Sequence, residues 1–426
     1  MPTSELNEFS RRSRWASGQP IGALMARALA NPNLISLAAG FVDPETLPIE
    51  LVQLATQALL SSPASARASL QYGTTHGSLK LRRLLKQRLE SRDRQTLQIN
   101  DDQLVLTAGS NELLHLTCDA LCDEGDIILS AAPTYLVFLG VMDSIGAVAQ
   151  GVESDDEGIC PDALDRALTR LESDGDLGKV RGVYLVSYFD NPGGRMAGQT
   201  RREKLWDVTA RWSERMGRPL ILLEDAAYRD LRFEGPDVPS LLQFDPTASR
   251  TVYLGTFSKS FSPGIRVGWG LLPHELSAAV IDLKTNTDFG SPHFSQQLIA
   301  HVLEQEWDIP HTERLCAGYR RKRDAMLAAL ERHFADQPGV AWRVPAGGLY
   351  VWLTLPAEME TGLGSPLWEH ALSEGVIYVP GEFCHPAHGT PKSRHGMRLS
   401  YGVTTVEQID AGIAMLARAV AQVGST

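Results

Sequence analysis

Short apolar runs alternate with longer helical patterns from about residue 49 to residue 305, and this alternation most limits the folds open to the 426-residue chain. Several runs are continuously apolar, as strands buried on both faces of a sheet must be. Strands that alternate with helices predict an α/β fold with a mostly parallel central sheet. The expected strands are residues 103–107, 126–130, 182–188, 219–224, 250–257 and 266–272.

Apolar residues recur at helical spacing in the segments between and after these strands. The expected helices include residues 112–122, 202–216 and 312–334. The last of them contains the run Arg-Arg-Lys-Arg at 320–323, which we interpret as a solvated helix face. Cys118 and Cys122 lie among apolar residues of the first helix, so core packing explains them better than metal binding or redox chemistry.

The pattern changes beyond Gln337 to shorter strands, followed by a terminal helix at about residues 405–423. This change predicts a second, smaller α+β domain. We expect three parts: an N-terminal segment that contributes to the small domain (1–48), a large α/β domain (49–310) and a small C-terminal α+β domain (311–426).

A stretch rich in glycine, proline and histidine at residues 380–396 is expected to form one loop. Four potential metal ligands lie in it, but their spacing matches no closed zinc site, so we expect no metal. These residues are Cys384, His385, His388 and His395.

Acidic residues outnumber basic ones by 51 to 40, which gives a formal net charge of −11. This charge disfavours binding to nucleic acids or to an anionic membrane, so small molecules are the expected partners. The N-terminal residues are polar, and no apolar run approaches the roughly 20 residues of a membrane-spanning helix. The cysteines are few and odd in number, which favours a cytoplasmic protein without disulfides.

Lys259 follows the expected strand 250–257, and Arg266 lies seven residues later. An uncharged lysine at such a position is an amine nucleophile toward an aldehyde. Hydroxyl groups and an arginine suit a phosphate group. The hydroxyls of this segment belong to Thr256, Ser258, Ser260 and Ser262.

Asp225 follows the very apolar strand 219–224, at the carboxyl end where ligands bind in open α/β sheets. A buried carboxylate there needs a cationic partner. A protonated pyridine nitrogen is such a partner. An aspartate on that nitrogen and a lysine Schiff base are the pair that pyridoxal phosphate (PLP) enzymes require.

With these residues the chain resembles the fold-type I, class I/II PLP-dependent aminotransferases over nearly its whole length. It is most similar to the kynurenine/aminoadipate-type branch. Asn191, Asp225, Lys259, Arg266 and Arg398 follow the family's order and approximate separations. The segments that carry the resemblance include ISLAAGFVDPETLP, YGTTHGSLKLRRLL, TAGSNELLHL, APTYLVF, SYFDNPGGRMAG, LGTFSKSFSPGIRVG and GMRLSYG.

The resemblance implies a role for each matching residue. Ser110 and Asn111 would bind the cofactor phosphate at a helix N-terminus, although the family more often has glutamine at the second position. The same phosphate would also contact Thr256, Ser258, Arg266 and, from the neighbouring subunit, Tyr72. Tyr135 would stack on the pyridine ring.

The remaining matches concern the ring oxygen and the substrate. Asn191 and Tyr228 would hydrogen-bond the phenolate oxygen of the cofactor. Arg398 would grip the substrate α-carboxylate with both arms of its guanidinium, and Gly40 would let the backbone approach the same carboxylate.

The resemblance implies transfer of an amino group from an α-amino acid to a 2-oxo acid by a ping-pong mechanism, through a Lys259 Schiff base. The same site chemistry leaves a lyase, a cyclopropane-forming synthase, a racemase or a decarboxylase open. In some transcription regulators this fold is a ligand-sensing module, which the acidic charge disfavours here.

The family also implies an obligate homodimer with active sites shared between the subunits. Aminoadipate-type relatives carry an arginine for acidic substrates where this chain has Gly22, which argues against a dicarboxylate. An apolar, aromatic or small substrate is favoured by the residues expected near the opening of the site, which are Phe41, Tyr72, His76 and Tyr350.

Overall fold

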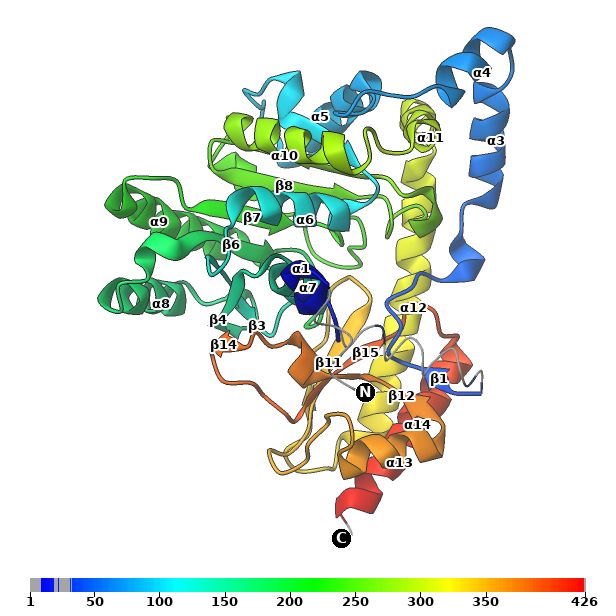
Figure 1. The fold of residues 1–426 in the computed structure, drawn as a ribbon. Coiled ribbons are helices and arrows are strands. Elements are labelled where there is room, and N and C mark those ends of the chain that lie inside the picture. Colours follow the sequence, from blue (N-terminus) through cyan, green and yellow to red (C-terminus); the bar gives the residue numbers. More distant parts are fainter. Residues whose placement is uncertain (1–8, 19–21, 23–30, 32, 425–426) are drawn as a thin grey trace.

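The computed structural model describes residues 9–18, 22, 31 and 33–424 (Figure 1). Its centre is a 9-stranded sheet in which all pairs from β14 to β8 are parallel, while β9 is antiparallel to both of its neighbours. The short strand β5 (Gly158–Ile159) pairs with β4. The expected mostly parallel sheet is confirmed. Its strands, in spatial order, are β14 (His388–Gly389), β4 (Val148–Asp155), β3 (Ile127–Ala132), β6 (Val180–Val186), β7 (Ile221–Asp225), β8 (Thr251–Thr256), β9 (Gly268–Leu271) and β2 (Leu104–Thr107).

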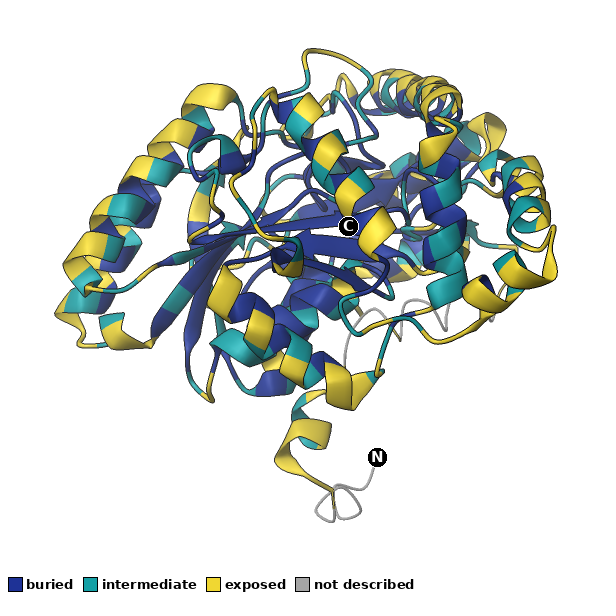
Figure 2. Cartoon of the chain, turned by 90° about the horizontal axis from the view of Figure 1, so that it is seen from above, coloured by how far each residue is buried: buried dark blue, intermediate teal, exposed yellow. Residues whose placement is uncertain are grey.

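Helices cover both faces of this sheet, so the inner strands are buried on both sides (Figure 2). One face carries α6 (Ser110–Leu121), α7 (Leu136–Ile145) and α10 (His274–Thr287). The other face carries α8 (Pro161–Ser173) and α9 (Gln199–Met216). This double burial explains why the strand sequences are continuously apolar.

Three strands of the sheet, β14, β4 and the short β5 that pairs with β4, were not predicted from the sequence, and all lie toward one edge. The strand β4 is only partly buried, so its sequence lacks a continuous apolar run. The strand β14 lies inside the stretch 380–396, where we expected a loop, and it pairs with Gln150 and Gly151 of β4. This stretch therefore extends the large sheet by one short strand.

The C-terminal part forms a 4-stranded antiparallel sheet in the order β10 (Ala341–Trp342), β11 (Tyr350–Thr354), β15 (Gly396–Ser400) and β13 (Val379–Pro380). The strand β1 (Ile35–Ser36) of the N-terminal segment pairs in parallel with β12 (Val376–Ile377). The other described helices are α1 (Arg11–Trp15), α3 (Ile49–Leu59), α4 (Pro63–Leu70), α5 (Leu79–Asp93), α11 (His293–Glu304), α12 (Asp308–Phe334), α13 (Pro366–Glu374) and α14 (Val406–Gly424).

The charged run at 320–323 lies on α12, and only its first half matches the solvated face that we expected. Lys322 and Arg323 are buried. The Lys322 ammonium lies 2.6 Å from a carboxylate oxygen of Asp43, and Arg323 donates to the carbonyl oxygen of Pro345 at 2.9 Å. The interpretation was wrong for these two residues because α12 is covered by segments distant in the sequence.

The five cysteines are unpaired. Cys118 on α6 and Cys122 at its C-terminal end pack in the apolar core, as expected. No helix within the described residues is long and apolar enough to cross a membrane. The described residues also contain no cluster of three or more histidine, cysteine or acidic side chains arranged to hold a metal ion.

Candidate active site

A cavity of about 380 Å³ lies at the carboxyl ends of the parallel strands, between the large sheet and the C-terminal sheet. Asp225 ends β7, Thr256 ends β8, and Ser110 begins α6 after β2. Tyr72 is the one residue of the predicted site that does not line this cavity. The predicted residues that line it are Gly40, Ser110, Asn111, Tyr135, Asn191, Asp225, Tyr228, Thr256, Ser258, Lys259, Arg266 and Arg398.

Lys259 lies in the turn after β8, and its side chain reaches across the cavity toward the N-terminal segment. Its ammonium donates to the carbonyl oxygen of Gly40 at 2.8 Å and lies 6.0 Å from the centre of the Tyr228 ring. A Cβ atom at Gly40 would lie 2.8 Å from the Tyr350 hydroxyl, so this position fits only glycine without a local shift. The absence of a side chain thus keeps Tyr350 close to the N-terminal segment.

Asp225 is a buried carboxylate with two neutral hydrogen-bond donors. One oxygen accepts from the Tyr184 hydroxyl at 2.8 Å, and the other accepts from the backbone N–H of Ala227 at 3.0 Å. Burial raises the pKa of Asp225, and these two hydrogen bonds lower it in part. Within the part of the chain that the structure describes, no cation pairs with this carboxylate, so a cationic ligand in the cavity could pair with it.

The start of α6 and the Arg266 guanidinium form a positively polarised corner of the cavity. Arg266 donates to the carbonyl oxygens of Ala108 and Pro263. A Cβ at Gly109 would collide with the guanidinium, and a Cβ at Gly268 would collide with the backbone at the start of α6. The two glycines therefore allow the arginine and the helix N-terminus to approach one another, an arrangement suited to an anion.

Arg398 lies on the opposite side of the cavity, on β15, and is almost completely buried. Its guanidinium donates to the side-chain oxygen of Asn191 at 2.9 Å and to the carbonyl oxygen of Ala38 at 2.6 Å. The guanidinium carbon lies 4.4 Å from the centre of the Tyr350 ring. Its Nε atom is buried without a partner in the structure, so the arginine retains an unused donor.

Tyr228 and Tyr350 connect the two sides of the cavity through their hydroxyl oxygens, which lie 3.0 Å apart. Burial raises the pKa of Tyr228 well above its usual value, and the neighbouring Tyr350 raises it further. The Tyr228 hydroxyl therefore keeps its proton near neutral pH and can donate it to an acceptor in the cavity.

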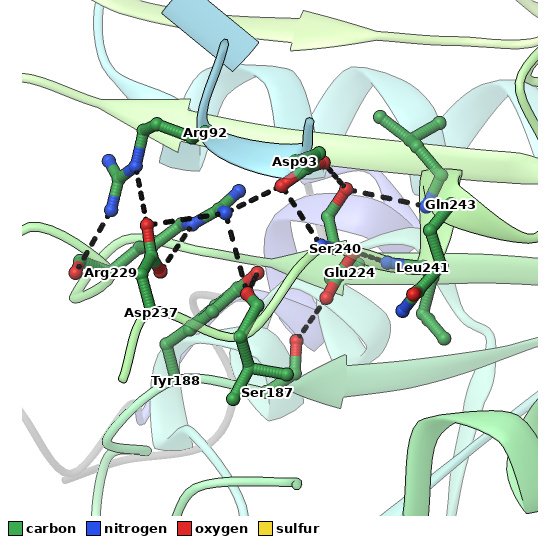
Figure 3. Close-up of polar contacts among 12 residues, drawn as sticks. Arg92, Asp93, Ser187, Tyr188, Glu224, Arg229, Asp237, Ser240, Leu241 and Gln243 are labelled. Atoms are coloured by element: carbon green, nitrogen blue, oxygen red, sulfur yellow. Dashed lines mark hydrogen bonds and ion pairs between the residues drawn. The ribbon is translucent and has the colours of Figure 1, made fainter. Parts of the chain in front are cut away.

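Buried polar contacts fix the backbone segment 224–229, which contains Asp225, from residues other than Asp225 itself (Figure 3). Glu224 is fully buried and accepts from the Ser187 hydroxyl at 2.6 Å and from the backbone N–H of Leu241 at 2.8 Å. It also forms an ion pair with Arg202, which is equally buried. The strand end before Asp225 is thus fixed on three sides.

The residue after Tyr228 is anchored in the same way (Figure 3). Arg229 is buried and forms ion pairs with Asp93 and Asp237. Its guanidinium also lies over the ring of Tyr188, 4.9 Å from the ring centre. The segment from 224 to 229 is therefore held at both ends, and Asp225 and Tyr228 lie between the two anchors.

Two residues that we expected near the opening of the site lie outside the cavity lining. Tyr72 is 79% exposed, and its ring meets the exposed ring of Phe289 edge to face, with centres 6.0 Å apart. His76 lies before α5, and its carbonyl oxygen accepts from the backbone N–H of Leu106. Phe41 and Tyr350, by contrast, line the cavity as expected.

Sequence reasoning missed Tyr184, the donor to Asp225. It lies in the middle of the apolar strand β6, and nothing in the local sequence separates it from the other buried tyrosines. Its contact depends on the parallel pairing of β6 with β7, which places Val186 opposite Asp225.

The chain is similar to a known protein family and to proteins of known structure. Residues 32–416, most of the chain, match the family described as aminotransferase class I and II. The chain belongs to this family. The recognition made on the sequence motifs is confirmed.

Individual relatives of this aminotransferase cover nearly the whole chain. It is 35% identical to aromatic-amino-acid aminotransferase 1 of Thermococcus litoralis, over 97% of this chain and 94% of the relative. It is 30% identical to 2-aminoadipate transaminase of Thermus thermophilus, over 91% of this chain and 90% of the relative. A crystal structure of Pyrococcus horikoshii kynurenine aminotransferase, in complex with pyridoxamine phosphate, superimposes with a TM-score of 0.89 at 31% identity and 98% coverage of both chains.

The protein is therefore an enzyme that transfers amino groups, with pyridoxal phosphate as its cofactor. The cavity fits that cofactor: Asp225 offers a buried carboxylate for a ring cation, and the corner formed by α6 and Arg266 suits a phosphate. Lys259 lies in the same cavity. The expected fold class, activity and cofactor are thus confirmed.

Proposed function

We propose that Lys259 is the residue that holds the cofactor aldehyde in the resting enzyme and moves the substrate α-proton at its Nζ atom. Pyridoxal phosphate, when bound, supplies a carbonyl that condenses with amines and a ring that withdraws electrons. Among the described residues, Lys259 is the only lysine that lines the cavity, and its Nζ lies 6.0 Å from the centre of the Tyr228 ring. A neutral amine at this position is both a nucleophile and a general base.

The phosphate would be held in the corner where helix α6 begins. The backbone N–H groups of Ser110 and Asn111 and the Arg266 guanidinium supply the positive side, and Thr256 and Ser258 supply hydroxyls 3.0 Å apart. These groups belong to separate segments, so the closely packed glycines in this corner serve to bring them together.

The ring would lie against Tyr135, with Asp225 at its nitrogen and with Asn191 and Tyr228 at its phenolic oxygen. The main support for this orientation is that Asp225 is buried in the cavity wall and accepts hydrogen bonds only from neutral donors, the Tyr184 hydroxyl and the Ala227 N–H. A protonated ring nitrogen would compensate that charge, and the pairing keeps the ring electron-withdrawing.

Arg398 would bind the α-carboxylate of the substrate. Its guanidinium is already oriented by Asn191 and Ala38 and retains an unpartnered Nε. A planar guanidinium fixed in this way can bind a carboxylate in a defined orientation, which positions the α-carbon for proton transfer. The substrate side chain would then extend toward Phe41 and Tyr350.

The substrate is proposed to be an aromatic or other apolar amino acid. Among the described residues, the cations of the cavity are Lys259, Arg266 and Arg398, and each already has a role. A second carboxylate on the substrate would therefore lack a partner there. The similarity to an aromatic-amino-acid aminotransferase supports this choice.

The enzyme is further proposed to act as a cytoplasmic homodimer in which Tyr72 completes the partner's site. Large apolar side chains are exposed next to Tyr72, at Leu70 and Phe289, and Ile49 at the start of α3 is exposed as well. Tyr72→Phe is expected to weaken cofactor retention without changing the dimer, measured by cofactor release from a dimer of confirmed mass. Unchanged retention would count against the contact.

We keep the division into an N-terminal segment (1–48), a large domain (49–310) and a small domain (311–426) as a proposal. The pairing of β1 with β12 supports the assignment of the N-terminal segment to the small domain. Domain motion would then change the distance between Arg398 and Lys259.

The decisive experiment is a visible absorption spectrum of the purified enzyme, repeated with single amino acids in the absence of an acceptor. Loss of the absorption of the lysine-bound cofactor, with an equal amount of 2-oxo acid, would establish transamination and identify the donor. Lys259→Ala should abolish both changes, whereas Lys204→Ala, which removes an exposed lysine, should alter neither. A spectrum that no amino acid converts would reject transamination for this site.

A further inference from the structure

The Tyr184 hydroxyl contacts the Asp225 carboxylate from outside the cavity. It donates to the Oδ2 atom at 2.8 Å, while the backbone N–H of Ala227 occupies the Oδ1 atom at 3.0 Å. Tyr184 is not among the described residues that line the cavity. Any effect that it has on the reaction must therefore pass through Asp225.

The Tyr184 ring is held rigidly in this position. It stacks on Phe138 of α7, with ring centres 4.1 Å apart and planes inclined by 11°. Both rings lie in the apolar cluster between the sheet and helices α6, α7 and α10. Burial and the nearby carboxylate raise the pKa of Tyr184 well above its usual value, so its hydroxyl remains a donor at neutral pH.

A carboxylate on a short side chain can turn about its terminal bond unless hydrogen bonds fix it. Each Asp225 oxygen has one fixed donor, and this leaves the remaining acceptor positions for the cavity. A donor on the outer side also stabilises the charged carboxylate, with which no cation of the described residues pairs. If the proton lay on Asp225 instead of on the ring nitrogen, both groups would be neutral, and the Tyr184 hydrogen bond would stabilise that state much less.

We propose that Tyr184 is a positioning residue for the cofactor: its hydroxyl fixes the Asp225 carboxylate and favours its charged form against the protonated ring nitrogen. This inference rests on the proposed function, in which Asp225 faces that nitrogen. The effect of Tyr184 should consequently depend on the presence of the nitrogen and of the Asp225 charge.

The test compares two ligands that cannot bond covalently to Lys259: pyridoxamine phosphate and its analogue with carbon in place of the ring nitrogen. Their dissociation constants are measured by calorimetric titration of the cofactor-free enzyme. The wild type should prefer the nitrogen-containing ligand. Tyr184→Phe should reduce this preference roughly tenfold or more, as expected for one hydrogen bond to a charged group, with little change for the carbon analogue.

Two further variants separate positioning from general loss of structure. Tyr378→Phe removes an equally buried hydroxyl that donates to the Thr361 carbonyl oxygen. Neither residue lines the cavity or contacts Asp225, so this substitution should leave the preference unchanged. In an Asp225→Asn background, Tyr184→Phe should have no further effect on the preference.

The outcomes are distinct. A wild-type preference that survives Tyr184→Phe would overturn the role of Tyr184 and leave the proposed function intact. A wild type with equal affinity for both ligands would instead contradict the placement of the ring nitrogen at Asp225, and with it this inference. Equal weakening of both ligands in Tyr184→Phe would show a packing role only and would also overturn the proposal.

Discussion

Replacing Glu224 by glutamine should destabilise the enzyme strongly although the two side chains have nearly the same shape. Each partner of the carboxylate is a donor: the Ser187 hydroxyl and Arg202 at one oxygen, and the Leu241 N–H at the other. An amide has one oxygen and one NH₂ group, so either Arg202 or the Leu241 N–H must face another donor. Arg202 also loses its counter-charge in a fully buried position.

The size of the effect follows from the burial of the pair. Breaking a buried ion pair by removal of one charge costs about 3–5 kcal/mol. Arg202 keeps two acceptors, the carbonyl oxygens of Ala197 and Ser187 at 2.9 Å, which favours the lower end. We therefore expect the free energy of unfolding to fall by about 3 kcal/mol.

The assay is reversible denaturant unfolding of the cofactor-free enzyme at one protomer concentration, followed by tryptophan fluorescence. Glu153→Gln is the matched control, because the same chemical change removes an ion pair to Arg166 whose side chains are 69% and 66% exposed. This control should change stability by less than about 1 kcal/mol. Equal effects of the two substitutions would refute the argument that burial makes the Glu224 pair important.

Three other predictions concern the site and its surroundings. Arg398→Lys should lower kcat/KM for amino acids roughly 10- to 100-fold, measured in steady state, because lysine cannot reproduce the planar guanidinium contacts; an unchanged value would exclude Arg398 from carboxylate binding. Gly268→Ala should weaken phosphate-dependent cofactor binding, since its Cβ would collide with the start of α6. A Cβ at Gly264 would make only an ordinary contact, 3.8 Å from the Ser262 hydroxyl oxygen, so Gly264→Ala should bind normally in the same titration. Burial lowers the pKa of His385 to about 4 in the folded enzyme, so on acidification this histidine is protonated at a higher pH in the unfolded chain than in the folded one. Stability should then fall from about pH 6.5 to about pH 4, and His385→Phe should reduce that fall in acid-unfolding curves.

The sequence predicted those parts of the site that depend on local order. Asp225 and Lys259 follow apolar strands, and Ser110 begins a helix after another, so all of them belong at the same edge of a parallel sheet. That edge is where the cavity lies. The roles of Asn191 and Arg398 came from resemblance alone, because they lie on separate segments whose approach no local pattern reports.

The features that the sequence did not predict have a common physical cause. When distant segments bury a residue between them, the local sequence shows no periodic pattern that reports this burial. Lys322 and Arg323 sit in a charged run typical of a solvated helix, yet Asp43 and Glu234 supply their partners from elsewhere in the chain. Tyr184 resembles any core tyrosine until β6 is paired with β7. A buried polar group is nearly always hydrogen-bonded. A polar residue in an apolar segment therefore predicts that a hydrogen-bond partner exists, but the sequence does not identify that partner. The partner is fixed by topology, and here the topology brings the Tyr184 hydroxyl to the carboxylate that the cofactor requires.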